Sequence, residues 1–158
     1  MHYLIRLIIE ADDSATAIDQ AKCAMDTLIE QREFDWYREE GDESAWEDCW
    51  KPMPLESNTA KAWVKDAMDP QFAEFKHSMA VIRHMILHYS DEQIFDEDFG
   101  ENRELHLSRY YFSKASGYHA NASLLYDTYG TAITSNTDLK SYVDQAKRYW
   151  VIQVDCHN

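Results

Sequence analysis

Hydrophobic residues fill both faces of a short stretch close to the start of the chain, residues 3–9. Successive side chains of a β-strand point to opposite faces. The odd-numbered positions would then give one wholly apolar face, and the even-numbered positions a second face interrupted only by Arg6. Apolar residues on both faces are typical of a strand inside a sheet that helices cover on at least one side. We therefore expect residues 3–9 to form a central strand.

The residues after this strand predict a helix and a second strand. The polar residues 12–14 suit a helix start, because Asp and Ser side chains cap the first free N–H groups. Hydrophobic residues then recur at helical spacing through residues 15–30. Residues 34–37, Phe-Asp-Trp-Tyr, are typical of a short strand. Residues 1–40 therefore predict a β-α-β unit.

The end of the chain shows the same order of elements. Residues 123–126 indicate a strand, and residues 131–133 indicate a hairpin arm beyond a turn. A capping signature begins at Ser135 and predicts a helix. Residues 150–154 predict the last strand. The apolar side chains that the helix is expected to bury are Leu139, Tyr142, Val143 and Ala146.

Two β-α-β units are the pattern of a ferredoxin-like α+β sandwich. In that topology the first and third strands are central, which agrees with the two apolar faces of the first strand. We expect a single domain in three parts. Residues 1–40 form its first half, residues 41–121 a long, mostly helical and acidic insertion, and residues 122–158 its second half.

Two helices are expected early in the insertion. The first covers residues 59–68, and the second runs from Pro70 to about Tyr89. A break is expected between them, because Asp69 suits a helix cap and Pro70 suits the first helical position. The apolar stripe of the second helix comprises Phe72, Phe75, Met79, Ile82, Ile86 and Tyr89.

Two further elements are expected later in the insertion. A capping box beginning at Ser90 predicts a short helix. Residues 105–116 are ambiguous: Gly117 favours a helix with a glycine C-cap, whereas the aromatic run at 110–112 favours a strand. We favour the helix.

Composition and cysteine usage indicate a folded protein of the cytoplasm. The chain has 158 residues, and 45% of them are hydrophobic, which suits a globular domain. Its three cysteines form no CxxC pair, as expected for free thiols in a reducing compartment. We find neither a secretory signal pattern nor an apolar run long enough to span a bilayer. We therefore expect a cytoplasmic protein without membrane contact.

The net charge of −14 is concentrated in two segments. Residues 30–56 hold ten Asp or Glu against three Lys or Arg, and residues 91–104 hold seven against one. Such segments repel nucleic acid and anionic membranes, so direct binding to either is not expected. A basic protein surface is the natural partner, although acidic loops can also serve solubility alone.

The stretch 36–50 combines three tryptophans with many carboxylates. Aromatic side chains supply contact area and carboxylates select a basic partner, so this composition suits an interface. The alternative is an acidic loop whose tryptophans pack onto their own core. The first predicted patch comprises Glu39, Glu40, Asp42, Glu43, Glu47 and Asp48, with Trp46 and Trp50 as anchors. The second predicted patch comprises Asp96, Glu97, Asp98 and Glu101.

Histidines 77, 84 and 88 would share one face of the predicted second helix. His84 and His88 are spaced i, i+4 and could hold one metal ion, whereas His77 lies about 10 Å further along the helix. The alternative is a solvated polar face rich in histidine. The segment 96–107 resembles a calcium loop, but its glycine and final residue are misplaced for an EF-hand.

No nucleophile-elbow, P-loop or dinucleotide-binding motif occurs, and no cofactor is expected. Our leading hypothesis is a non-enzymatic inhibitor whose acidic segments dock on a basic, nucleic-acid-binding protein. Carboxylates would then mimic phosphates, as in phage anti-restriction or anti-CRISPR proteins. One alternative is a small metal-dependent or acid/base enzyme using His77, His84 and His88. Another is a homo-oligomeric ferredoxin-like structural protein.

Overall fold

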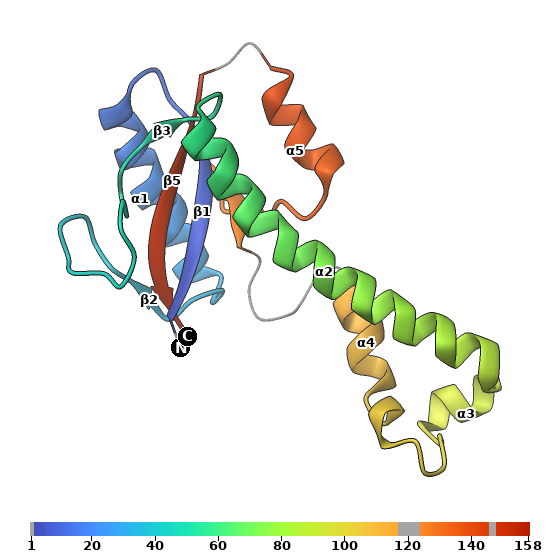
Figure 1. Ribbon diagram of the computed structural model, residues 1–158. Helices are drawn as coiled ribbons and strands as arrows, with labels where there is room; N and C mark the ends of the chain where they lie inside the picture. Colours follow the sequence, from blue (N-terminus) through green and yellow to red (C-terminus); the bar gives the residue numbers. More distant parts are fainter. Residues whose placement is uncertain (1, 117–123, 146–147) are drawn as a thin grey trace. The chain divides into compact units, whose positions relative to one another are not determined.

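Strand β1 (His2–Glu10) lies inside a mixed sheet in the computed structural model, which describes residues 2–116, 124–145 and 148–158 (Figure 1). It pairs antiparallel with β5 (Tyr149–His157) from His2–His157 through Glu10–Tyr149. On its other side it pairs parallel with the short strand β4 (Leu125–Asp127). The predicted central strand is confirmed. Both strands predicted near the chain's end are present within the described residues.

The strand order of the described sheet is β2-β5-β1-β4, and β3 also pairs with β5. Strands β2 (Trp36–Tyr37) and β3 (Met53–Pro54) both lie along the outer edge of β5, one near each end. An α+β fold is therefore present, but the ferredoxin-like order is not confirmed. The central strands are the first and the last, because β5 pairs with β1 on one edge and with β2 and β3 on the other, while β1 also pairs with β4.

Helix α1 (Ser14–Glu30) covers one face of the sheet. The side chain of Asp13 caps it by accepting a hydrogen bond from the Thr16 backbone N–H. Its buried face packs against the odd-numbered residues of β1 and against Ile152 and Val154 of β5. This helix follows its sequence prediction. Its buried residues are Ala17, Ala21, Ala24, Met25 and Leu28.

The other face of the sheet is covered by the first part of α2 (Asn58–His88) and by α5 (Asn136–Val143). The Ser135 cap of α5 is confirmed by its bond to the Asp138 N–H. The expected burial of α5 is wrong, because none of its residues is fully buried. Leu139 and Tyr142 are half-buried, and Val143 is 61% exposed. Ala146 lies outside the described residues.

Helix α2 runs without interruption from Asn58 to His88, with Pro70 in its interior. The break predicted at Asp69–Pro70 is therefore wrong. Proline removes one backbone donor, but its fixed φ is close to the helical value, so the turns on either side continue. Pro70 nevertheless marks a boundary, because the chain forms two compact units, residues 1–69 with 122–158 and residues 70–121.

The second unit contains the later turns of α2 together with α3 (Asp91–Asp96), the 3-10 helix η1 (Arg103–Leu105) and α4 (Ser108–Ala115). The capping box at Ser90 and the helix predicted within residues 105–116 are confirmed, and Gly117 lies outside the described residues. The buried core comprises Ile82, Met85, Phe99 and Leu105.

The predicted apolar stripe on α2 is only partly correct. Ile82 is buried, whereas Phe72, Phe75 and Ile86 are between 43% and 62% exposed. The buried line instead includes Ser78 and Met85, because the face that packs on η1 and α3 is rotated relative to the predicted stripe. None of the described helices is long and apolar enough to cross a membrane.

Replacement of Pro70 tests how the proline affects the continuous helix. Pro70→Ala restores an N–H for the Asp66 carbonyl and removes a penalty of about 3 kcal/mol. We expect amide hydrogen exchange around this turn to slow by roughly a hundredfold. Ala73→Gly, at an exposed position of the next turn, is the matched control. It should accelerate exchange roughly fivefold. Unchanged or faster exchange in Pro70→Ala would contradict the expectation.

Candidate functional site

The acidic loop, residues 38–48, follows the outer edge of β5 between β2 and Cys49. At its start, the Arg38 N–H donates to the Asp155 carbonyl at 2.8 Å. Beyond its end, Cys49 forms a bridge with Gln153, whose carbonyl accepts from the Trp50 N–H at 2.9 Å. Both ends of the loop are therefore joined to the same central strand.

Side-chain hydrogen bonds from outside and within the acidic loop hold its middle as well. The indole N–H of Trp50 donates to the Arg38 carbonyl at 2.7 Å, which closes the loop across its base. The Ser44 hydroxyl donates to the buried carboxylate of Asp155 at 2.9 Å and accepts from the Trp46 N–H at 3.1 Å. These bonds connect the loop to a strand whose own residues are almost fully buried. The loop is therefore ordered from its inner side.

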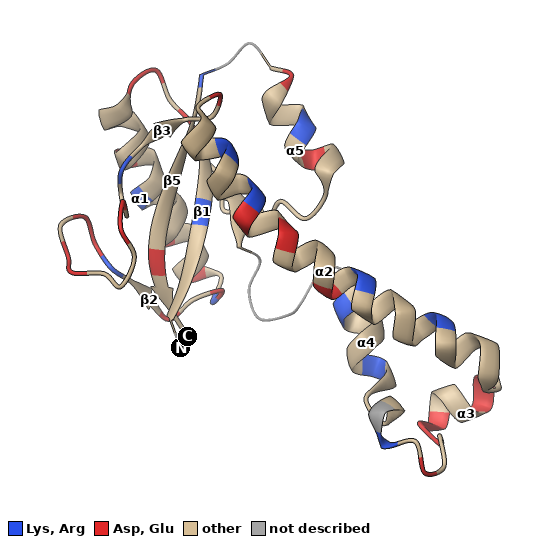
Figure 2. Ribbon diagram, in the orientation of Figure 1, with Lys and Arg blue, Asp and Glu red and all other residues tan. Residues whose placement is uncertain are grey.

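The carboxylates of the acidic loop point to solvent. The exposed set comprises Glu39, Glu40, Asp42, Glu43, Glu47 and Asp48. Figure 2 shows Asp and Glu along this loop, which leaves β2. Glu40 pairs with Lys22 at 2.9 Å and Asp48 with Lys51 at 3.1 Å. In the described part of the chain the other four form no ion pair with Lys or Arg, so the loop keeps a net negative charge.

The two predicted tryptophan anchors differ in position. Trp46 is half-buried, so part of its ring reaches the surface. Trp50 is only 5% exposed and packs in the core beneath α1. As an anchor for a partner Trp50 is wrong, because its ring packs in the core and its N–H donates to the Arg38 carbonyl. The sequence indicated an aromatic anchor but not the direction in which it points.

A group of aromatic rings at one end of the sheet was missed by sequence reasoning. This terminal aromatic cluster comprises His2, Trp36, Trp46 and His157. Trp36 stacks on His157 with ring centroids 5.0 Å apart, and the Arg38 guanidinium lies 5.1 Å from the Trp36 centroid. His2 packs edge-on against Trp36. Pairing of β5 with both β1 and β2 brings His157 beside His2 and Trp36, so no local sequence pattern predicts the cluster.

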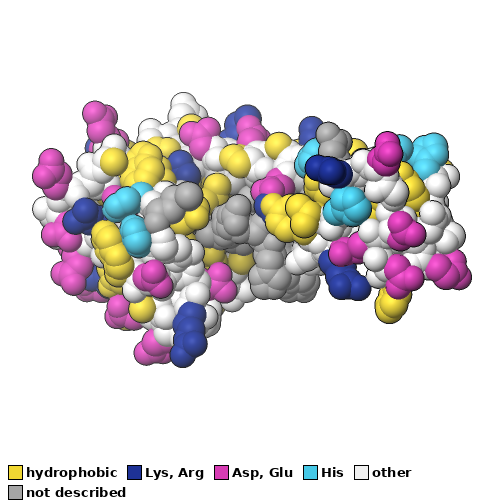
Figure 3. Space-filling view, turned by 90° about the horizontal axis from the view of Figure 1, so that it is seen from below, with side chains coloured by type: hydrophobic (Ala, Val, Ile, Leu, Met, Phe, Trp, Pro, Cys, Tyr) yellow, Lys and Arg dark blue, Asp and Glu magenta, His cyan; other side chains and the backbone are white. Residues whose placement is uncertain are grey.

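The terminal aromatic cluster lies beside the acidic loop. The His2 ring bonds to the Asp155 carboxylate at 2.8 Å, and the same carboxylate accepts from Ser44 of the loop. Trp36 is 39% exposed. Figure 3 views the molecule from the side of the termini and shows histidine and hydrophobic side chains with Asp and Glu around them. The first unit therefore presents aromatic and acidic groups together.

The second acidic patch lies in the other unit, around the end of α3. Asp96, Asp98 and Glu101 are exposed. Glu97 is half-buried and accepts from the Arg109 N–H at 3.2 Å and the Ser108 hydroxyl at 2.9 Å. These bonds hold the pKa of Glu97 below its usual value. Glu97 thus fixes the start of α4.

The histidines predicted as metal ligands lie on an exposed face of α2. The rings of His84 and His88 have centroids 4.5 Å apart, as the i, i+4 spacing predicts. His77 instead packs against Tyr111 at 5.8 Å. Among residues 2–116, 124–145 and 148–158, no three His, Cys, Asp or Glu side chains gather as a metal site. The metal assignment of His84 and His88 stays a prediction.

Comparison with known proteins gives one finding. A family model described as a domain of unknown function (DUF7995) matches residues 1–158. No curated protein matches the chain, and no solved structure matches it.

The hydrogen bond from Trp50 to the loop backbone can be tested by replacing the indole with a ring that carries no N–H. Trp50→Phe leaves the partly buried Arg38 carbonyl without its donor and also removes part of a core ring, at a combined cost of about 2–4 kcal/mol in unfolding free energy. Denaturant unfolding measures this loss. Trp36→Phe, at a 39% exposed position, should cost clearly less. Equal costs would contradict the role of the Trp50 indole in holding the acidic loop.

Proposed function

Since the chain belongs to the DUF7995 family, whose description names no activity, we propose from its own surface that it binds a basic protein without catalysing a reaction. The acidic loop would be the centre of the contact. One observation carries this proposal: six exposed carboxylates stand on residues 39–48, which contain no Lys or Arg, and hydrogen bonds to β5 and to Trp50 hold that loop.

Order in the acidic loop favours tight binding. A loop that is already fixed loses little conformational entropy when a partner binds. Its like charges attract a basic surface over several ångströms and raise the association rate, an effect that salt weakens. Solubility alone does not require the carboxylates to be held on the edge of a central strand.

The terminal aromatic cluster would supply the less polar part of the interface. Trp and Arg are the residues that most often dominate binding energy at protein interfaces. Trp36 and Trp46 are partly accessible, and Arg38 lies over Trp36 at the start of the acidic loop. In this proposal Trp36 takes the anchoring role that sequence reasoning gave to Trp50.

The narrower form of the proposal is a nucleic-acid mimic. Carboxylates held on an ordered loop can occupy the phosphate positions of a nucleic-acid-binding groove, which is built to attract negative charge. The partner would then be a nucleic-acid-binding protein, and the protein would act as an inhibitor of the phage or mobile-element anti-defence type, such as anti-CRISPR proteins. The second acidic patch would extend the contact if both units engage the partner.

Neutralising the acidic loop tests this function. We expect a Glu39→Gln, Glu40→Gln, Asp42→Asn, Glu43→Gln variant to lose capture of basic proteins from a lysate of the source cells, with affinity falling roughly ten- to a hundredfold. Capture by the parent should weaken between low and high salt. Added double-stranded DNA should compete with the parent for the captured protein if the mimic form is right.

A control with the same change in charge separates the loop from the net charge. Asp12→Asn, Asp19→Asn, Glu30→Gln, Glu33→Gln changes four exposed carboxylates outside the acidic loop. This control should retain capture. Equal loss in both variants, or capture that salt does not affect, would contradict the proposal. Light scattering on the parent distinguishes a contact with a partner from self-association.

A further inference from the structure

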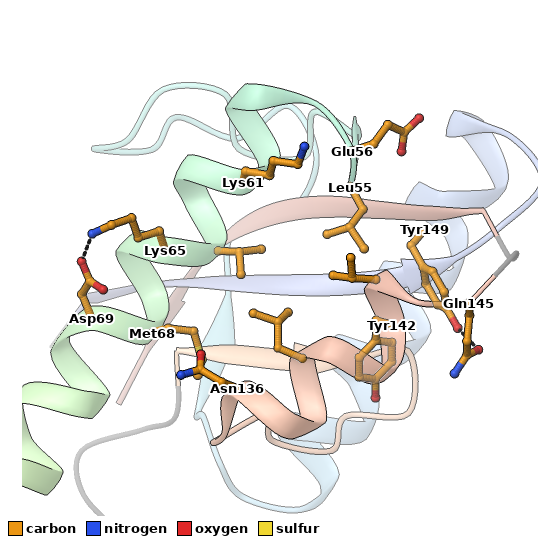
Figure 4. Close-up of a pocket in the computed structure, with 13 residues that line it drawn as sticks. Leu55, Glu56, Lys61, Lys65, Met68, Asp69, Asn136, Tyr142, Gln145 and Tyr149 are labelled. Atoms are coloured by element: carbon orange, nitrogen blue, oxygen red, sulfur yellow. Dashed lines mark hydrogen bonds and ion pairs between the residues drawn. The ribbon is translucent and has the colours of Figure 1, made fainter.

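The first unit contains a cavity of about 530 Å³ between α2 and α5 (Figure 4). Its lining is mainly apolar and comes from three parts of the chain: Leu55 after β3, Val64 and Met68 on α2, and Leu139 on α5. Tyr142 and Tyr149 form an aromatic wall, with ring centroids 5.5 Å apart. The volume lies in the range of small-molecule sites, which are usually apolar with a few polar groups.

The cavity exists because α5 does not pack closely on the sheet. Within the described residues, α5 buries no side chain completely, although Leu139 and Tyr142 contact the cluster formed by α2 and the sheet. The apolar side of α5 therefore faces a space that no described side chain fills.

The two tyrosine hydroxyls are occupied by the protein. Tyr142 donates to the Asp127 carboxylate at 3.0 Å, and Tyr149 donates to the Gln145 side chain at 2.9 Å. Burial and the neighbouring Asp127 raise the pKa of Tyr142, so its hydroxyl stays protonated and keeps donating. These rings therefore offer a ligand mainly apolar contact.

Two ammonium groups stand at the rim on one face of α2. Lys61 and Lys65 are one turn apart, so both border the cavity. Lys65 pairs with Asp69 on the same helix. In the described chain Lys61 has no carboxylate within ion-pair distance. Glu56 also lies at the rim, but Figure 4 shows its carboxylate directed away from the centre of the cavity.

We propose that this cavity binds a small amphipathic carboxylic acid. The apolar chain or ring of the ligand fills the space between Val64, Leu139 and the tyrosine wall. Its carboxylate pairs with Lys61 at the rim, where the ammonium stays hydrated and its apolar stem lines the cavity. This site is independent of the acidic loop, since no loop residue lines the cavity.

Titration calorimetry with three compounds of equal chain length tests the proposal. Octanoate, octanol and octylammonium share an apolar tail and differ in the charge of the head group. We expect saturable binding of octanoate at neutral pH, weaker binding of octanol and the weakest binding of octylammonium. Absence of saturable octanoate binding would overturn the proposal, as would octanol or octylammonium binding as tightly as octanoate.

Three variants assign the binding to this cavity. Lys61→Gln should weaken octanoate binding about three- to fivefold and leave octanol binding unchanged. Lys76→Gln, an exposed lysine of α2 outside the lining, is the matched control and should change neither. Leu139→Trp should fill the cavity and abolish binding of all three compounds while Tm stays unchanged or rises. Octanoate binding that survives Leu139→Trp, or that Lys61→Gln does not weaken, would overturn the assignment.

Discussion

The pairing of β1 with β5 is the interaction on which the rest of the structure depends. It joins the first and last parts of the chain along nine residue pairs, from His2–His157 through Glu10–Tyr149. Residues 5–9 of β1 and 151–156 of β5 are buried, so the backbone N–H and C=O groups there must be satisfied by neighbouring strands. Helices then cover both faces, and every other described strand adds to one edge of this pair.

Asp155 connects the central β1–β5 pair to the acidic loop and to the terminal aromatic cluster. Its side chain is almost fully buried on β5, and a buried carboxylate is costly unless it is hydrogen-bonded. Its partners are the His2 ring and the Ser44 hydroxyl, one from the terminal aromatic cluster and one from the acidic loop. Hydrogen bonds to one buried carboxyl group therefore link the two surface features that we propose as an interface.

The two proposed sites use different sides of β5. The acidic loop lies along the outer edge of the strand, through Gln153 and Asp155. The cavity lies over the face covered by α2 and α5, where Tyr149 contributes to the wall. One strand can support both the acidic loop and the cavity, because its edge and its face use different groups. Backbone atoms bond along the edge, and side chains pack on the face.

The sequence by itself determined the elements whose signals are local. Apolar residues on both faces specified β1, polar residues at 12–14 and the capping signatures at Ser90 and Ser135 specified helix starts, and the charge pattern specified the acidic loop. Each signal arises from residues within a turn or a strand of one another. Such short-range physics does not depend on the remainder of the fold.

Only the tertiary structure decided the features that depend on distant partners. Local sequence cannot tell whether β2 pairs with β4 or with β5, because backbone hydrogen bonds carry no residue identity. It cannot show that Trp50 points inward, that α2 continues through Pro70, or that α5 leaves a cavity. Each outcome depends on packing between segments far apart in the chain, where the gain from burial exceeds the local preference.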